Sequence, residues 1–205
     1  KALLIDSGMH TPNAKQMAES ITKLPIMLLN THGDPDHISG NGSFDSFYMH
    51  PDEEDIYRSQ GGSGIILPVK DNDVIDLGNR PLKIFAIPGH TPGSIAVLDI
   101  NSRVLIPGDS IQDGNIFMFR EYRNMSLYVE SLKKLSRYMD EFDIIYPSHG
   151  SFPVYPELIA RLIEGAQQVI DGKAQGEVVE VLGTPVMLYR FPYAGFLCDL
   201  PENEK

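Results

Sequence analysis

Four of the six histidines of this chain lie in polar loops that directly follow short apolar segments. These loops span residues 31–37, 88–94, 107–109 and 147–150. The first loop is the densest, because it holds His32, Asp34, Asp36 and His37 within six positions. Imidazole nitrogen and carboxylate oxygen are ligands that zinc and iron accept in proteins. The pattern therefore predicts a metal site that is built from several loops.

Strands that end at a common sheet edge would bring such loops together. Hydrophobic patterning predicts strands at 1–6, 26–30, 44–50, 74–77, 82–87, 95–100, 104–106 and 142–146, and one or two hairpin strands within 177–200. Helices are expected at 11–24, 126–139 and 156–172, and a short helix with a loop within 51–64. Both halves run from strands through a polar loop to a helix. The sequence thus predicts an α/β fold with four layers, an αββα sandwich.

Composition narrows the class of protein. The 205 residues include 28 Asp and Glu against 17 Lys and Arg, for a formal charge of -11. This balance disfavours nucleic acid and anionic membranes as partners. Cys198 is the single cysteine, and no apolar run approaches the ~20 residues of a membrane span. We expect a soluble, cytoplasmic protein with a small-molecule substrate; the composition leaves its oligomeric state open.

The loops also form an ordered set of motifs. His-x-Asp-x-Asp-His is followed by GHTPGS, then by Gly-Asp and then by Ser-His-Gly. This order resembles the metallo-β-lactamase superfamily of dinuclear metallohydrolases, in particular its branch similar to glyoxalase II, from residue 26 to residue 150. The resemblance implies a single domain over residues 1–205 with the αββα fold. The chain starts inside a strand-like segment without an initiator Met, which leaves open whether N-terminal strands are missing.

The resemblance implies two divalent metal ions, zinc before iron or manganese. The implied ligands are His32, Asp34 and His90 for one ion, Asp36, His37 and His149 for the other, and Asp109 as a bridge. Asp36 would also orient the attacking hydroxide and is the implied catalytic residue. Asp6, at the end of the first expected strand, would hold ligands from behind without binding metal.

The chain departs from the family pattern at two positions. Asp34 stands where the family usually has His, and a carboxylate there shifts metal preference from zinc toward iron or manganese. A non-ligating surface carboxylate is the alternative for Asp34. Gln112 stands where lactonases of the superfamily tend to carry Tyr, which weakens the lactonase interpretation. The bridging Asp109 argues against β-lactam hydrolysis.

The resemblance therefore implies a hydrolase that uses a metal-bridging hydroxide on a small thioester, lactone or phosphodiester, with thioesters favoured. Two alternatives stay open: a diiron oxidoreductase similar to the flavodiiron metal domain, and a metal-binding protein with one degenerate site.

Other polar or reactive residues have simpler interpretations. His10 and His50 are expected to be turn histidines, and the acidic run 52–55 a solvated helix start. Cys198 is expected to pack as a small core residue. Residues 116–119 would line a substrate pocket or pack in the core.

Overall fold

The computed structural model describes residues 1–201 and divides into two compact units. The first unit comprises residues 1–86 and 93–101, and the second comprises residues 87–92 and the chain from residue 102 onward. Within residues 1–201, no helix combines the length and the apolar character needed to cross a bilayer. The prediction of a single domain over residues 1–205 stays a prediction.

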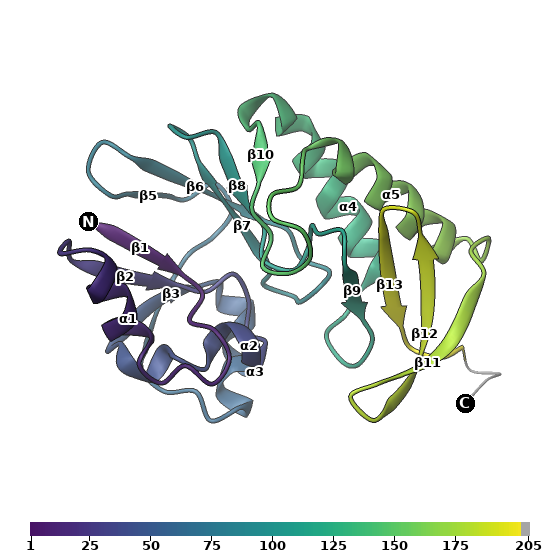
Figure 1. The fold of residues 1–205 in the computed structure, drawn as a ribbon, viewed down its shortest axis with the longest axis horizontal. Helices are drawn as coiled ribbons and strands as arrows, with labels where there is room; N and C mark the ends of the chain where they lie inside the picture. The colour runs from purple at the N-terminus through teal and green to yellow at the C-terminus, as the bar shows by residue number, and fades with distance from the viewer. Residues whose placement is uncertain (202–205) are drawn as a thin grey trace. The chain divides into compact units, whose positions relative to one another are not determined.

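A four-stranded parallel sheet forms the centre of the first unit (Figure 1). Its strands, in sheet order, are β1 (Ala2–Ile5), β2 (Ile26–Leu29), β3 (Ser46–Met49) and β4 (Ile65–Pro68). Leu28, Phe47 and Met49 from these strands are buried together in one hydrophobic cluster. Because all four strands run parallel, their carboxyl ends lie at one edge, and the chain leaves that edge through Asp6, the 30–34 loop and residues 50–53.

Short helices connect these strands. They are α1 (Ala14–Ile21), α2 (Pro35–Ile38), α3 (Glu54–Ser59) and two 3₁₀ turns, Asn41–Ser43 and Pro51–Glu53. The first helix is shorter than the predicted 11–24, because the backbone is already extended at Thr22. The strand β4 was not predicted; its four residues end at a proline and follow a glycine-rich stretch, and pairing with β3 makes them a strand.

The first unit also contains an antiparallel group, β5 (Val74–Asp76), β6 (Pro81–Ala86) and β7 (Ile95–Asp99). These strands agree with the predicted 74–77, 82–87 and 95–100 to within one residue at each end. Every residue of β7 is buried. The amide of Ile95, the first residue of β7, donates to the carbonyl of Thr31 at 2.9 Å, so β7 holds the loop after β2.

Two short parallel strands position polar loops in the second unit. They are β8 (Val104–Ile106) and β10 (Ile144–Ile145), with Val104 opposite Ile144. Parallel pairing places their carboxyl ends at one edge, where Asp109 follows β8 and His149 follows β10. A backbone hydrogen bond of 3.2 Å from Ser148 N–H to the Gly108 carbonyl joins the two loops.

The rest of the second unit is a mixed sheet with two longer helices. In sheet order, the strands are β11 (Gly176–Val181), β12 (Thr184–Phe191), β13 (Ala194–Cys198) and β9 (Asn115–Met118). The helices are α4 (Met125–Leu135) and α5 (Glu157–Ile170), and a 3₁₀ segment (Ser136–Glu141) continues α4. The helices α4 and α5 pack against each other (Figure 1). Residues 116–119 therefore belong mostly to a strand, and Ile116 and Phe119 are buried. Of the two interpretations of this segment, a pocket lining or core packing, the burial of these two side chains favours core packing.

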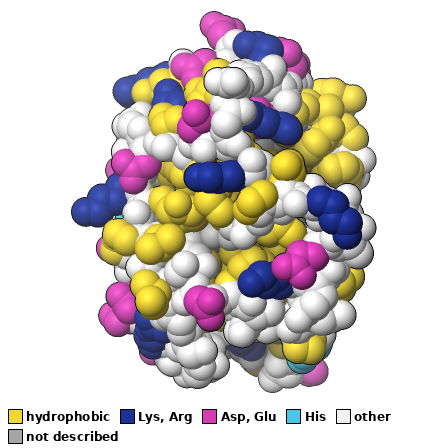
Figure 2. All heavy atoms as spheres, turned by 90° about the vertical axis from the view of Figure 1, so that its left-hand side faces the viewer, with side chains coloured by type: hydrophobic (Ala, Val, Ile, Leu, Met, Phe, Trp, Pro, Cys, Tyr) yellow, Lys and Arg dark blue, Asp and Glu magenta, His cyan; other side chains and the backbone are white. Residues whose placement is uncertain are grey.

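The surface carries both hydrophobic and charged side chains. On the face drawn in Figure 2, hydrophobic side chains are interspersed with acidic and basic ones. Exposed large hydrophobic residues of the first unit include Met17, Ile21 and Ile65.

Candidate metal centre

The loop after β2 presents the densest group of candidate ligands. Asp34 caps the short helix α2 with an extended backbone, and Pro35 begins the helix with its φ already suited to it. His32 precedes this turn and His37 lies within it, and both imidazoles are almost fully buried. Their ring centroids are 4.0 Å apart with an interplanar angle of 47°.

Each of these histidines lies beside a carboxylate. The distance from His32 Nε2 to Asp34 Oδ2 is 3.5 Å, and that from His37 Nε2 to Asp36 Oδ2 is also 3.5 Å. Two ligand atoms that each lie about 2.1 Å from a tetrahedral zinc ion are separated by roughly 3.4 Å. Both pairs are therefore spaced as two ligands of one ion would be.

Asp6 orients His37. The Asp6 carboxylate accepts from His37 Nδ1 at 2.8 Å and from the backbone N–H of Thr31 at 2.7 Å. Because Nδ1 must carry the proton to donate to a carboxylate, the neutral ring keeps its lone pair on Nε2, beside Asp36. Asp6 thus contacts the ring nitrogen opposite the candidate ligand atom, as the family resemblance implies.

His32 is oriented through one further residue. Thr31 Oγ1 lies 2.8 Å from the Asp6 carboxylate and 2.9 Å from His32 Nδ1. A hydroxyl has one proton, which goes to the carboxylate, so Thr31 accepts from Nδ1–H of His32. The lone pair of His32 is therefore also on Nε2, the atom beside Asp34.

His90 lies in the second unit. Its Nδ1 donates to the carbonyl of Phe117 in β9 at 2.9 Å, which again leaves Nε2 as the ligand atom. The loop that carries it is held by α4, because Asn124 N–H donates to the Gly89 carbonyl at 2.8 Å and Ser131 Oγ donates to the Pro88 carbonyl at 2.7 Å.

Asp109 lies between two histidines of the second unit. Its Oδ2 is 3.8 Å from His90 Nε2 and 3.4 Å from His149 Nε2. Next to it, the Tyr128 hydroxyl donates to the carbonyl of Ser110 at 2.8 Å. Burial raises the pKa of Tyr128 well above its usual range, so the hydroxyl stays protonated and keeps this hydrogen bond. Gln112, also buried, donates from Nε2 to the Asp109 carbonyl at 3.4 Å.

The predicted ligands thus form two sets, one in each unit. The first unit brings together His32, Asp34, Asp36 and His37, and the second brings together His90, Asp109 and His149. Which ion each residue binds stays a prediction. The other two histidines are turn residues, as expected: His10 is exposed with a φ of 53°, and His50 accepts from the backbone N–H of Asp52 at 3.3 Å.

The expectation of a solvated acidic run at 52–55 is wrong for Glu53. This side chain is fully buried, and its carboxylate accepts backbone N–H groups from Gly33 and Gly93. A run of charged residues is normally read as solvent-facing, and the carboxylate is buried here because two distant amides compensate it. The position of Glu53 in the sequence could have predicted this role. Glu53 follows β3 at the same sheet edge where Asp6 follows β1 and His32 follows β2.

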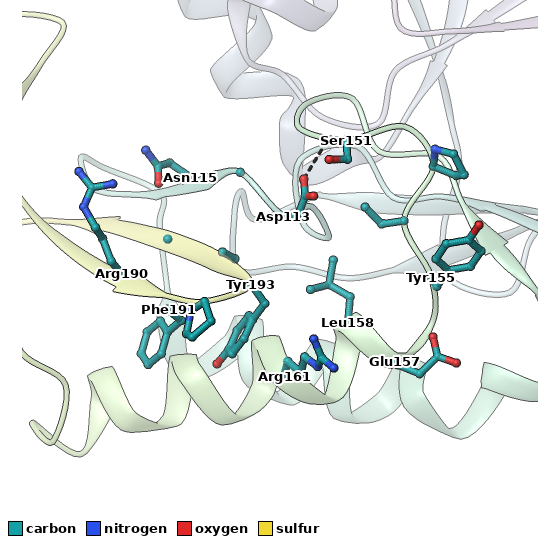
Figure 3. Close-up of a pocket in the computed structure, with 16 residues that line it drawn as sticks. Asp113, Asn115, Ser151, Tyr155, Glu157, Leu158, Arg161, Arg190, Phe191 and Tyr193 are labelled. Carbon is teal, nitrogen blue, oxygen red and sulfur yellow. Dashed lines mark hydrogen bonds between the residues drawn. The ribbon is translucent and has the colours of Figure 1, made fainter.

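A cavity of about 910 Å³ lies within the second unit (Figure 3). Its wall includes Asp113, four residues after Asp109, and Ser151, two residues after His149. Tyr193 and Arg161 line it from the β12–β13 turn and from α5. Partial burial raises the pKa of the Asp113 carboxyl, but hydrogen bonds from Ser151 and from its own backbone outweigh burial and lower that pKa below its usual value. The cavity therefore combines a carboxylate, a guanidinium and aromatic rings.

Comparisons with known proteins agree with these motifs. A family model described as "Metallo-beta-lactamase superfamily" matches residues 1–149. The human acyl-coenzyme A thioesterase MBLAC2 is 25% identical over 66% of this chain and 60% of its own length. The hydroxyacylglutathione hydrolase of Prochlorococcus marinus is 27% identical over 72% of this chain and 60% of its own. The human mitochondrial persulfide dioxygenase ETHE1 is 32% identical over 54% and 43%. The chain thus spans no more than about 60% of these three relatives.

Solved structures confirm the predicted α/β fold. A metallo-beta-lactamase from Pontibacter korlensis superposes with a TM-score of 0.70 at 16% identity, over 80% of this chain and 81% of its own. The di-iron-bound form of TTHA1623 superposes with a TM-score of 0.60 at 24% identity, over 78% and 87%.

Proposed function

Because the chain belongs to the metallo-β-lactamase superfamily, we propose that it is a metal-dependent hydrolase of a small ester-like substrate, with thioesters as the favoured class. One observation carries the proposal. In each unit, imidazole Nε2 atoms lie 3.4 to 3.8 Å from carboxylate oxygens, and in His32, His37 and His90 the opposite ring nitrogen is already hydrogen-bonded. This donor set suits zinc, iron or manganese.

We assign the ligands as the family resemblance implies. One ion would be held by His32, Asp34 and His90, and the other by Asp36, His37 and His149. The carboxylate of Asp109, which lies beside two histidines of its own unit, would contribute to holding both ions. The assignment needs both ligand sets to bind the same pair of ions, which makes it directly testable.

When bound, the two ions lower the pKa of the attacking water and polarise the scissile carbonyl. The protein side chains have separate tasks. The partly buried Asp36 carboxylate accepts a hydrogen bond from the water and thereby orients it. Asp6 and the Phe117 carbonyl keep the protons of His37 and His90 on Nδ1, so that both rings bind through Nε2.

The substrate is proposed to be a small molecule. The cavity of about 910 Å³ beside the Asp109 and His149 loops falls within the size range of ligand pockets. The relative named acyl-coenzyme A thioesterase supports a thioester over a lactone or a phosphodiester. The formal charge of -11 disfavours a polymeric nucleic acid as substrate.

Metal loading and hydrolysis together test this function. We expect two ions per chain after reconstitution and turnover of at least one thioester in a panel that also holds lactones and phosphodiesters. His90→Ala and His149→Ala should each abolish turnover, because each removes a ligand of a different ion. His10→Ala, which removes an exposed histidine, is the matched control. Trace metal only, or full turnover in either ligand variant, would reject the proposal, and one ion per chain would indicate a degenerate site.

A second candidate is an iron-dependent oxidoreductase. Two observations favour it: the relative named persulfide dioxygenase, and the carboxylate at position 34, which shifts the metal preference of the site away from zinc toward iron or manganese. An iron-loaded protein that consumes oxygen with a persulfide or thiol substrate, and that hydrolyses no ester in the panel, would select this function.

A further inference from the structure

We propose that Glu53 is a positioning residue that clamps the His32 loop to the segment leading into β7 and thereby sets the position of His32 for metal binding. The inference rests on the proposed metal-dependent function. It concerns a residue outside the ligand set and outside the motifs that carry the family resemblance. All of the residues in the clamp belong to the first unit.

Both oxygens of the Glu53 carboxylate are used. Oε2 accepts the backbone N–H of Gly33 at 2.6 Å, and Oε1 accepts the backbone N–H of Gly93 at 2.6 Å. Glu53 has 0% of its surface exposed, so no bulk water competes for these amides. Hydrogen bonds to an ionised acceptor are shorter and about twice as strong as neutral ones. The carboxylate thus joins two loops that are 60 residues apart in the sequence.

The two glycines leave room for this carboxylate. A Cβ on Gly33 would lie 2.8 Å from Glu53 Oε2, and a Cβ on Gly93 would lie 2.8 Å from Glu53 Cγ. Neither glycine has a positive φ, so the close approach of Glu53 explains why the side chain is absent. Gly33 directly follows His32, and the motif GHTPGS ends with Gly93 and Ser94.

The 3₁₀ turn Pro51–Glu53 aims the side chain. Its start is capped by His50, which accepts the Asp52 N–H, and Glu53 N–H donates to the His50 carbonyl at 3.0 Å. A second tie runs parallel to the clamp, since Ile95 N–H donates to the Thr31 carbonyl at 2.9 Å. His32 therefore lies between two anchored residues. Thr31 is hydrogen-bonded to Ile95, and Gly33 is hydrogen-bonded to Glu53.

A neutral side chain of the same shape cannot replace this carboxylate. In Glu53→Gln, one oxygen becomes an NH₂ group that faces a backbone N–H, so one loop must separate from the clamp. Glu54→Gln is the matched control: it makes the same chemical change one residue later, at an exposed glutamate whose partner is Arg58.

The experiment uses the full chain and three readouts. In metal-free protein, NMR should show the amide protons of Gly33 and Gly93 shifted downfield and slow to exchange, and both signals should lose this character in Glu53→Gln. Affinity for Zn²⁺, measured by competition with a chromogenic chelator, should fall 10- to 100-fold in Glu53→Gln and by less than twofold in Glu54→Gln. The visible spectrum of Co²⁺-loaded protein should change in Glu53→Gln only.

The outcomes separate the possibilities. If Glu53→Gln is less stable but keeps the wild-type Zn²⁺ affinity and Co²⁺ spectrum, Glu53 is merely structural and the proposal is wrong. If Glu53→Gln does not fold, Glu53→Asp, which keeps the charge but has a shorter reach, should lose one downfield amide and bind Zn²⁺ more weakly; unchanged binding would overturn the proposal. If the wild-type protein binds no metal, the proposed function fails, while the amide signals still show whether the clamp exists.

Discussion

The imidazoles of His32, His37 and His90 share one hydrogen-bonding pattern. In each ring, Nδ1 faces an oxygen at 2.8 to 2.9 Å, supplied by Thr31, Asp6 or the carbonyl of Phe117. The rings are buried and their orientation is set by the protein itself. Less conformational freedom is therefore lost when a ligand binds to Nε2, which is how outer hydrogen bonds raise metal affinity.

Asp34 is the least usual member of the ligand set, and its replacement tests whether it binds metal. We expect Asp34→His to raise the zinc-to-manganese ratio of protein equilibrated with equal amounts of both ions, because imidazole suits zinc and carboxylate suits manganese. Asp45→His, at an exposed position, is the control. An unchanged ratio in Asp34→His would mean that Asp34 does not contact the ion.

The reactivity of Cys198, which lies outside the proposed ligand set, tests how deeply its thiol is buried. Burial raises the pKa of its thiol to about 12, from an ordinary value of 9.0. At pH 8, the thiolate fraction should then be about 1,000-fold lower in the folded protein than in the unfolded chain. Iodoacetamide should accordingly modify Cys198 slowly until denaturant is added. The same ionisation makes the folded state lose stability as the pH rises above 9 toward 12. Rapid modification of folded protein at pH 8 would contradict the burial of this thiol.

At the level of secondary structure, parallel strand ends position the candidate ligands in both units. The strands β1 and β2 end before Asp6 and the His32 loop, and β8 and β10 end before Asp109 and His149. The GHTPGS loop differs, because it follows an antiparallel strand and is held in place by α4. Gly89 adopts a φ of +139° there, and its carbonyl accepts the backbone N–H of Asn124, the residue that caps the start of that helix.

Gly89 should therefore be intolerant of substitution. A Cβ at this position would lie 2.5 Å from the backbone nitrogen of Tyr128, so Gly89→Ala requires α4 to move. We expect the free energy of unfolding to fall by roughly 3 kcal/mol or more, from the combined cost of overpacking and strained φ. Gly172→Ala, with a φ of +67° and no neighbour within 4 Å, isolates the φ cost of about 1 kcal/mol. Equal losses in denaturant unfolding would show that the contact with α4 is unimportant.

For the molecule as a whole, the division of ligands between two units has a thermodynamic consequence. Four candidates lie in the first unit and three in the second, and three of the seven are carboxylates. Bound cations would offset the repulsion among these carboxylates in a chain of charge -11. If both sets bind the same ions, as proposed, metal binding must stabilise both units together.

This consequence can be measured by hydrogen exchange. Zn²⁺ at about 1,000 times its Kd should stabilise the folded protein by roughly 4 kcal/mol, and a chelator should reverse the effect. Slower exchange is expected in both units, at β2 in the first and β8 in the second. His149→Ala should reduce the added protection in the first unit as well, although His149 belongs to the second. If the added protection were confined to one unit, the two ligand sets would not bind the same ions, and the proposed assignment would be wrong.

Much of this protein could be predicted from its sequence because the relevant signals are local. The ligand types and their spacing in 31–37, 88–94, 107–109 and 147–150 are contiguous motifs, and their order along the chain indicated the family and its α/β fold. Most strands were found because their apolar runs are bounded by glycine, proline or asparagine.

Other features depended on contacts between distant segments and were decided only by the tertiary structure. The strand β4 exists through pairing with β3, and the proton on His90 is assigned by a carbonyl 27 residues away. Glu53 looked like one member of a solvated acidic run, yet it is buried because Gly33 and Gly93 bring two amides to its carboxylate. A charge can be removed from water only where donors replace that water, and those donors come from loops 20 and 40 residues away, whose meeting depends on the folded chain.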